Sequence, residues 1–152
     1  MNEQAYLEQL AHLQQQAWPN GHAREPEYPL GHQPLTEYLK HWGRTSPDKP
    51  AVQFYGYSLS YAELDEQSDR FATLLHAQGI QPGERVAVFM PNCPQFHIAF
   101  YGILKAGAIH APVSPMAMPM ELGYQLKDCG ASVIVCFDQL LPVVREIAGQ
   151  SQ

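Results

Sequence analysis

The chain has 152 residues, enough for one domain that buries about 70% of the surface its unfolded form would expose. Its net charge of −6, with nine Lys and Arg scattered along the chain, argues against nucleic-acid binding, because nucleic-acid-binding proteins carry a basic patch. Hydrophobic residues make up 45% and charged residues 16%, which is typical of globular proteins and excludes disordered and fibrous classes.

Residues 1–33 are predicted to form a leader helix and a connector. Apolar residues recur at helical spacing on one face of residues 6–17, and Gln and Glu occupy the other face. The apolar positions are Tyr6, Leu7, Leu10, Leu13 and Ala17. From Trp18 to Gln33, prolines, glycines and histidines follow without a hydrophobic period, which is typical of a connector.

A second helix and a hairpin are expected next. The helix covers residues 34–44 and turns Leu35, Tyr38, Leu39 and Trp42 inward. Residues 51–55 and 58–61 read as short strands on either side of Gly56 and Tyr57. A glycine in a two-residue connection indicates a tight hairpin turn.

A third helix is predicted to begin after Ser60. Glu63 follows three residues later, which is the spacing of a capping box. The helix should run to about Gln78, where Gly79 provides a left-handed stop. Its predicted inner stripe consists of Leu64, Ser68, Phe71 and Leu75.

Three short apolar stretches then alternate with helices. The stretches are Arg85–Met90, Ala108–Val113 and Ser132–Phe137, and they lack the alternation of a half-exposed strand, so we expect buried parallel strands. Asp138 is the expected N-cap of the last helix. The expected helices cover residues 94–106, 119–130 and 138–147. This order predicts an α/β fold with a mostly parallel sheet and flanking helices, whose edges need further strands from more sequence or another chain.

No residue of the sequence stands out as catalytic or as a ligand of a cofactor or metal. Residues 91–94 follow a strand and open a helix, a place where parallel sheets bind ligands, but they lack the GxGxxG pattern, so we interpret them and Cys93 as structural. Ser58, Ser60 and Ser114 lie outside any nucleophile elbow.

The histidines and a group of carboxylates also have structural interpretations. The histidines have no paired spacing for zinc, and we expect His110 to be hydrogen-bonded in the core and His97 to face solvent. Asp65, Glu66 and Asp69 are expected to form a solvated helix face. The other histidines are His12, His22, His32, His41 and His76.

Targeting signals are not apparent in the sequence. Residues 1–5 are polar and acidic, unlike a secretory signal, and no apolar run approaches the roughly 20 residues that span a bilayer. Cys93, Cys129 and Cys136 are odd in number and lack CxxC spacing, which favours a reducing compartment. We expect a cytoplasmic protein without a transmembrane segment, and a peripheral association with membranes stays open.

Several ordered segments between about Trp18 and Leu141 resemble the start of AMP-forming acyl-CoA synthetases, the adenylate-forming ligase superfamily. They are most similar to bacterial long-chain fatty-acid–CoA ligases. The segments are Leu59–Leu64, Val86–Gln95, Gly102–Ile109, Val113–Met116 and Glu121–Ala131. Ser114, where these ligases often have Asn, and the methionine-rich Met116–Met120 depart from the pattern and leave acyl-chain length open.

The resemblance implies that residues 34–152 are the N-terminal part of an AMP-binding domain. The family activates a carboxylate with ATP and Mg²⁺ to an acyl-adenylate and transfers the acyl group to coenzyme A. Its phosphate loop and catalytic residues have no counterpart before Gln152, so the chain alone is expected to be inactive and to bind none of these groups tightly. The complete enzyme is expected to act on fatty acids as a homodimer.

Two alternatives remain at this stage. A stand-alone interaction module, descended from a degenerate ligase, would use the leader and the open sheet edges to pair with another chain. A small flavodoxin-like domain would instead bind a nucleotide or flavin.

Overall fold

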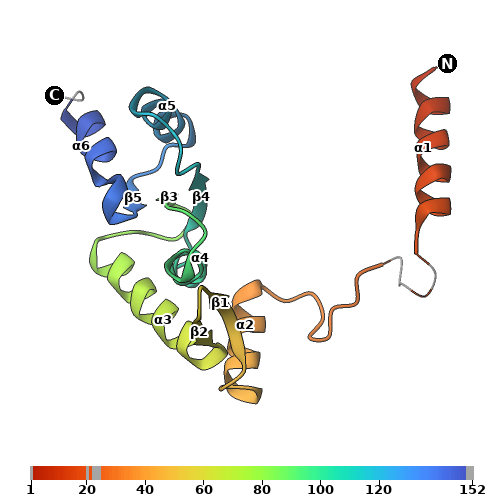
Figure 1. Cartoon of the computed structure of the whole chain (residues 1–152), viewed down its shortest axis with the longest axis horizontal. Helices are drawn as coiled ribbons and strands as arrows, with labels where there is room; N and C mark the ends of the chain where they lie inside the picture. Colours follow the sequence, from red (N-terminus) through yellow and green to blue (C-terminus); the bar gives the residue numbers. More distant parts are fainter. Residues whose placement is uncertain (1, 20, 22–24, 150–152) are drawn as a thin grey trace. The chain divides into compact units, whose positions relative to one another are not determined.

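A computed structural model describes residues 2–19, 21 and 25–149, and the chain divides into two compact units, residues 1–33 and 34–152. The first unit contains the predicted leader helix, α1 (Glu3–Ala17; Figure 1). The side chain of its N-cap, Asn2, accepts a hydrogen bond of 2.8 Å from the backbone amide of Ala5. No residue of α1 is buried, so its helical pattern has no packing partner within the described part of its own unit.

The second unit begins with helix α2 (Leu35–Thr45) and an antiparallel hairpin of β1 (Pro50–Phe54) and β2 (Tyr57–Ser60). Phe54 pairs with Tyr57, so the turn consists of Tyr55 and Gly56 and the predicted turn pair is wrong by one residue. Both turn residues have positive φ angles, 45° and 85°, as a type I′ turn requires because its twist matches that of the strands.

Helix α3 (Tyr61–Ala77) begins with the predicted capping box. The backbone amide of Glu63 donates to Ser60 Oγ at 3.2 Å, and the backbone amide of Ser60 donates to Glu63 Oε2 at 2.8 Å. Gly79 follows the helix with a φ angle of 89°, which confirms the left-handed stop. The buried stripe of α3 consists of Leu64, Ser68, Ala72 and Leu75.

A satellite core joins α2, the hairpin and α3. Its buried members are Leu39, Leu59 and Leu64, one from each element. Leu35, which the sequence placed on the inner side of α2, is exposed because it lies in the first turn of the helix, before this core begins.

The parallel sheet has the strand order β4-β3-β5. The strands are β3 (Arg85–Phe89), β4 (Ile109–Val113) and β5 (Val133–Cys136). In the central strand, residues 86–89 are fully buried. The expectation of buried strands is wrong for β5, whose residues are all half-buried, and for β4 except Val113, because both are edge strands.

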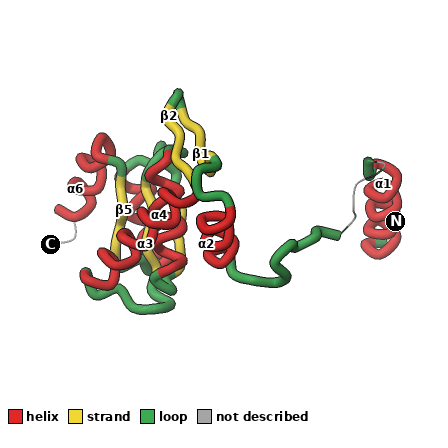
Figure 2. Tube along the Cα trace, turned by 90° about the horizontal axis from the view of Figure 1, so that it is seen from below, coloured by secondary structure: helices red, strands yellow, loops and turns green. Residues whose placement is uncertain are grey.

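Helices cover both faces of this sheet (Figures 1 and 2). Val86 and Val88 of β3 pack toward α3 and α4 (Pro94–Lys105), whereas Ala87 and Phe89 pack toward α5 (Pro119–Cys129) and α6 (Leu141–Gly149). This alternation follows the two-residue period of a strand. The structure therefore confirms the predicted α/β fold with its leader helix and hairpin.

The approach to α6 differs from the sequence prediction. Asp138 does not cap α6, because a short 3₁₀ turn, η1 (Asp138–Leu140), comes first and has Phe137 as its N-cap. Asp138 Oδ1 accepts a 2.9 Å hydrogen bond from the adjacent backbone amide of Gln139. The carboxylate is thus used within the turn and is not available to the start of α6.

Candidate functional site at the carboxyl edge of the sheet

The carboxyl ends of the parallel strands meet at one edge of the sheet. Phe89 at the end of β3 pairs with Val113 of β4 on one side and with Cys136 of β5 on the other. Ligands of open α/β sheets bind beyond this edge. The loops that leave it are therefore the first candidates for a binding site.

The loop after β3 is a packed turn. Cys93 is the N-cap of α4, but its side chain makes no capping hydrogen bond and is buried in the core with Met90 and Ile103. Its carbonyl accepts a 3.0 Å hydrogen bond from the backbone amide of Phe96. This geometry supports the structural interpretation of residues 91–94, since reactive cysteines are at least partly exposed.

The loop after β4 is closed by Ser114. Its hydroxyl accepts a 3.3 Å hydrogen bond from the backbone amide of Met116, and its carbonyl accepts one of 3.0 Å from Ala117, which is buried. The side chains of Met116, Met118 and Met120 are exposed around this turn. Ser114 is thus used to shape the turn, as Ser60 is used to cap α3.

The end of β5 carries a thiol that is unsuited to nucleophilic chemistry. Burial raises the pKa of Cys136 above its ordinary value of 9.0, and the carboxylate of Asp138 raises it further. The thiol is therefore protonated near neutral pH, and the thiolate that reacts is scarce.

His110 lies on β4 and faces α4. Its ring lies edge-on to Phe96 and Phe100, with centroid distances of 5.5 and 5.1 Å. Its Nε2 atom is buried and has no hydrogen-bond partner among the described residues, so the prediction of a hydrogen-bonded histidine is wrong at this atom because aromatic rings surround it. Burial lowers the pKa of His110 below 6.5.

The other metal-ligating side chains do not gather. His97 is half-buried on α4, beside Phe96, and His22 lies outside the described residues. Within residues 2–19, 21 and 25–149, no group of three or more His, Cys, Asp or Glu residues could hold a metal ion. The same residues include no helix long and apolar enough to cross a membrane.

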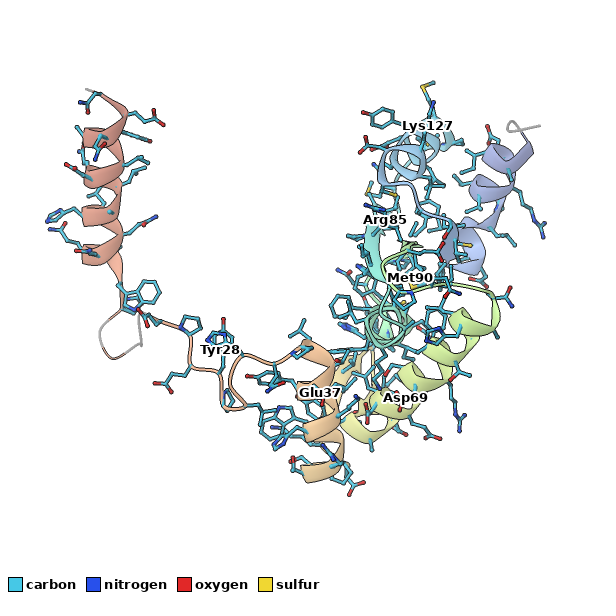
Figure 3. All side chains as sticks on the ribbon, turned by 180° about the vertical axis from the view of Figure 1, so that it is seen from behind. Tyr28, Glu37, Asp69, Arg85, Met90 and Lys127 are labelled. Atoms are coloured by element: carbon cyan, nitrogen blue, oxygen red, sulfur yellow. The ribbon has the colours of Figure 1, made fainter. Side chains whose placement is uncertain are left out.

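The carboxylates of α3 form an ion-pair cluster that the sequence did not predict. Lys105 Nζ lies 2.6 Å from Asp65 Oδ1 and 2.7 Å from Asp69 Oδ1, and it also donates to the Asp65 carbonyl at 2.8 Å. The lysine side chain is only 5% exposed. The prediction of a solvated face is therefore wrong for Asp65, which is 22% exposed, because α4 brings a buried cation to it. Asp69 (labelled in Figure 3) pairs with the same lysine but is 62% exposed, as predicted. Glu66 is exposed and pairs with Arg70.

Gly102 explains how α4 comes close enough for this cluster. A Cβ atom at this position would lie 2.7 Å from the ring of Phe71 and 3.0 Å from the Ser68 carbonyl oxygen, both on α3. One helical turn later Lys105 meets the carboxylates, and Gly107 turns the chain into β4 with a φ angle of 73°. The segment Gly102–Ile109 thus has a packing function.

A groove of about 530 Å³ opens on the face of the sheet that α5 and α6 cover, opposite to α3 and α4. Leu126 and Lys127 of α5, Val133 and Ile134 of β5, and Ile147 of α6 are among its lining residues. It lies at the start of β5, away from the carboxyl edge. The lining is mostly apolar, and the groove leaves the edge strand β5 incompletely covered by α5 and α6.

The family of AMP-binding enzymes matches residues 39–152, three quarters of the chain. The chain belongs to this family. A long-chain-fatty-acid–CoA ligase of Bacillus subtilis (strain 168) is 40% identical over 116 residues, which are 76% of this chain and 21% of the relative. A ligase of the same description from Salmonella typhimurium is 39% identical over 108 residues, 70% of this chain and 19% of the relative. The chain thus spans about a fifth of these relatives, and the resemblance noted in the sequence is confirmed.

Solved structures agree with this assignment. The N-terminal domain of FACL13 from Mycobacterium tuberculosis has a TM-score of 0.74 and 30% identity, with 79% of this chain and 31% of that chain covered. A benzoate CoA ligase from Burkholderia xenovorans LB400 has a TM-score of 0.72 and 27% identity, with 76% and 24% covered. The fold is that of the N-terminal domains of acyl-CoA synthetases.

Proposed function

We propose that this chain is the N-terminal framework of a long-chain fatty-acid–CoA ligase. The observation that carries the proposal is the 40% identity over 116 residues to a ligase of that description. The complete enzyme would join a fatty-acid carboxylate to the α-phosphate of ATP with release of pyrophosphate. The coenzyme A thiol would then displace AMP from the acyl-adenylate. Mg²⁺ would accompany ATP.

The loops at the carboxyl edge support a framework role. Ser114, Cys93 and Asp138 are each used by backbone hydrogen bonds or core packing within their own turns. Catalysis of adenylation needs groups that stabilise charge on the transferring phosphoryl group. We place those groups, and the tight binding of ATP, Mg²⁺ and coenzyme A, in the part of the ligase that this chain does not include. The chain alone is then inactive.

ATP–pyrophosphate exchange tests this proposal. The full-length product of the source gene should exchange labelled pyrophosphate into ATP only when a long-chain fatty acid is present. Two controls are the same reaction without fatty acid and the 152-residue chain in place of the full-length product. A full-length product that exchanges with amino acids but not with fatty acids would contradict the proposed substrate class, and exchange by the short chain would contradict the framework role.

We further propose that the complete ligase is a cytoplasmic homodimer to which α1 contributes. Leu7 and Leu13 on the apolar side of α1 are exposed, and a surface of this kind is buried in stable dimers. Sedimentation equilibrium should give a dimer that Leu7→Glu weakens and Gln15→Glu on the polar side does not. An unchanged dimer with Leu7→Glu would remove α1 from the interface.

A further inference from the structure

The β1–β2 hairpin ends in aromatic side chains that face solvent. Phe54, Tyr55 and Tyr57 are 37%, 97% and 52% exposed, and the first two rings meet edge-to-face at 4.7 Å. Figure 2 shows that the hairpin projects beyond the helices and the sheet of its own unit. We define residues 54–57 as the aromatic tip. Its rings are thus presented at a protruding end of the fold.

Tyr55 occupies a backbone position that tyrosine disfavours. Its φ angle is 45°, and it is the non-glycine residue with positive φ in the described part of the chain. A left-handed conformation costs an ordinary L-residue about 1–2 kcal/mol, and Asn or Gly is usual at the first position of a type I′ turn. Because the ring is 97% exposed, packing offsets little of this cost. Backbone strain that packing does not offset is the ground for a functional hypothesis about this side chain.

The sequence around the tip is free of charge. Between Lys49 and Glu63 the chain contains no Asp, Glu, Lys or Arg. Tyrosine and phenylalanine rings without neighbouring charges suit the headgroup region of a bilayer, where the ring contacts acyl chains and the hydroxyl stays in water. The net charge of −6 argues against attraction to anionic lipids, so insertion of the rings must provide the binding free energy.

We propose that the aromatic tip docks this chain on a membrane surface by shallow insertion of Phe54, Tyr55 and Tyr57. The choice of a lipid partner rests on the proposed function, because long-chain fatty acids partition into bilayers and a ligase that acts on them gains from contact with that source. Binding is driven by apolar burial. It is therefore insensitive to salt and does not require anionic lipid.

Flotation with phosphatidylcholine vesicles tests the proposal on the 152-residue chain, without ATP or fatty acid. The informative variant is Tyr55→Asn, which creates an Asn-Gly turn and therefore preserves the hairpin while it removes the ring. It should lower the vesicle partition coefficient about tenfold, as expected for the loss of a half-inserted ring. The matched control, Tyr124→Asn, removes a tyrosine of α5 that is 71% exposed and should leave partitioning unchanged.

A second measurement locates the insertion. Tryptophan emission should shift to shorter wavelength on vesicle addition in Tyr55→Trp and not in Tyr124→Trp, with Trp18 and Trp42 as a background common to both. Absent vesicle binding, unchanged binding by Tyr55→Asn, or binding that needs anionic lipid and is lost in high salt would each overturn the proposal. Because adenylation is not measured, failure here is distinct from failure of the proposed function.

Discussion

Helices α1 and α3 have similar amphipathic patterns but different surroundings. Both have a side-chain N-cap, Asn2 for α1 and Ser60 for α3. Only α3 has buried residues, and only α3 is joined to a neighbour through the Lys105 ion pairs. Hydrophobic periodicity thus specifies a helix, whereas the stability of that helix within a fold comes from the residues of the partner helix.

The largest effect is expected from breaking the ion-pair cluster. Lys105→Met should destabilise the second unit by about 3 kcal/mol, because it leaves Asp65 partly buried without its cation. Urea unfolding followed by tryptophan fluorescence measures this change, with Trp42 in the second unit as the reporter and Trp18 as a background common to all variants. The matched control is Arg70→Met, whose partner Glu66 is exposed and whose loss should cost less than about 1 kcal/mol. If both variants lowered the free energy of unfolding equally, burial would not be the cause of the stronger contribution expected from the Lys105 ion pairs.

The close approach of α3 and α4 can be tested at Gly102. Gly102→Ala places a methyl group 2.7 Å from the ring of Phe71, and the strain should cost about 2 kcal/mol. Gly123→Ala in α5 is the control, since the added methyl group would lie 3.8 Å from Ile147, an ordinary contact, and alanine favours helix by about 1 kcal/mol. Gly102→Ala should therefore lower the free energy of unfolding, whereas Gly123→Ala should raise it. A Gly102→Ala protein as stable as the parent in thermal unfolding would refute the packing role.

The two helix caps should differ in their effect on unfolding. Ser60→Ala removes half of the capping box of α3 and should lower the free energy of unfolding by about 1 kcal/mol. Asn2→Ala should lower helix content by circular dichroism but leave the cooperative transition in place, because α1 has no buried residue. If Asn2→Ala lowered the transition midpoint as much as Ser60→Ala, α1 would be part of the same cooperative unit.

The smallest effect concerns pH. Burial lowers the pKa of His110 below its ordinary value of 6.5, so the unfolded chain binds a proton more readily than the folded chain. Stability is therefore full above pH 6.5 and is lost as the pH falls through the folded pKa. His110→Phe should reduce this acid-side loss in urea titrations between pH 7 and pH 5, a range about the ordinary histidine pKa. An unchanged pH profile would show that other groups cause the loss.

Most of the fold could be predicted because it depends on local signals. The capping box at Ser60 and the glycine stop at Gly79 are written in adjacent residues, and the structure has both. The errors concern partners distant in sequence. Asp65 was predicted to be solvated because nothing near it in sequence indicates Lys105, which lies on another helix and covers it.

The loops of the candidate site, the hairpin turn and the ion-pair cluster were less accessible to sequence reasoning. The position of the turn at Tyr55 depends on the register of β1 and β2. The turn at Asp138 depends on which backbone amide donates to its carboxylate. Hydrophobic periodicity specifies neither. A signal for the ion-pair cluster did exist. Gly102 and Lys105 lie one helical turn apart, as do Asp65 and Asp69, so each pair shares a helix face.

Calorimetric titration of ATP and Mg²⁺ into the 152-residue chain tests whether these residues hold a nucleotide site. If this chain is framework and the nucleotide-binding groups lie in the rest of the ligase, no saturable heat will appear up to millimolar ATP. Saturable binding at micromolar ATP would contradict the account, because the nucleotide site would then lie within these residues.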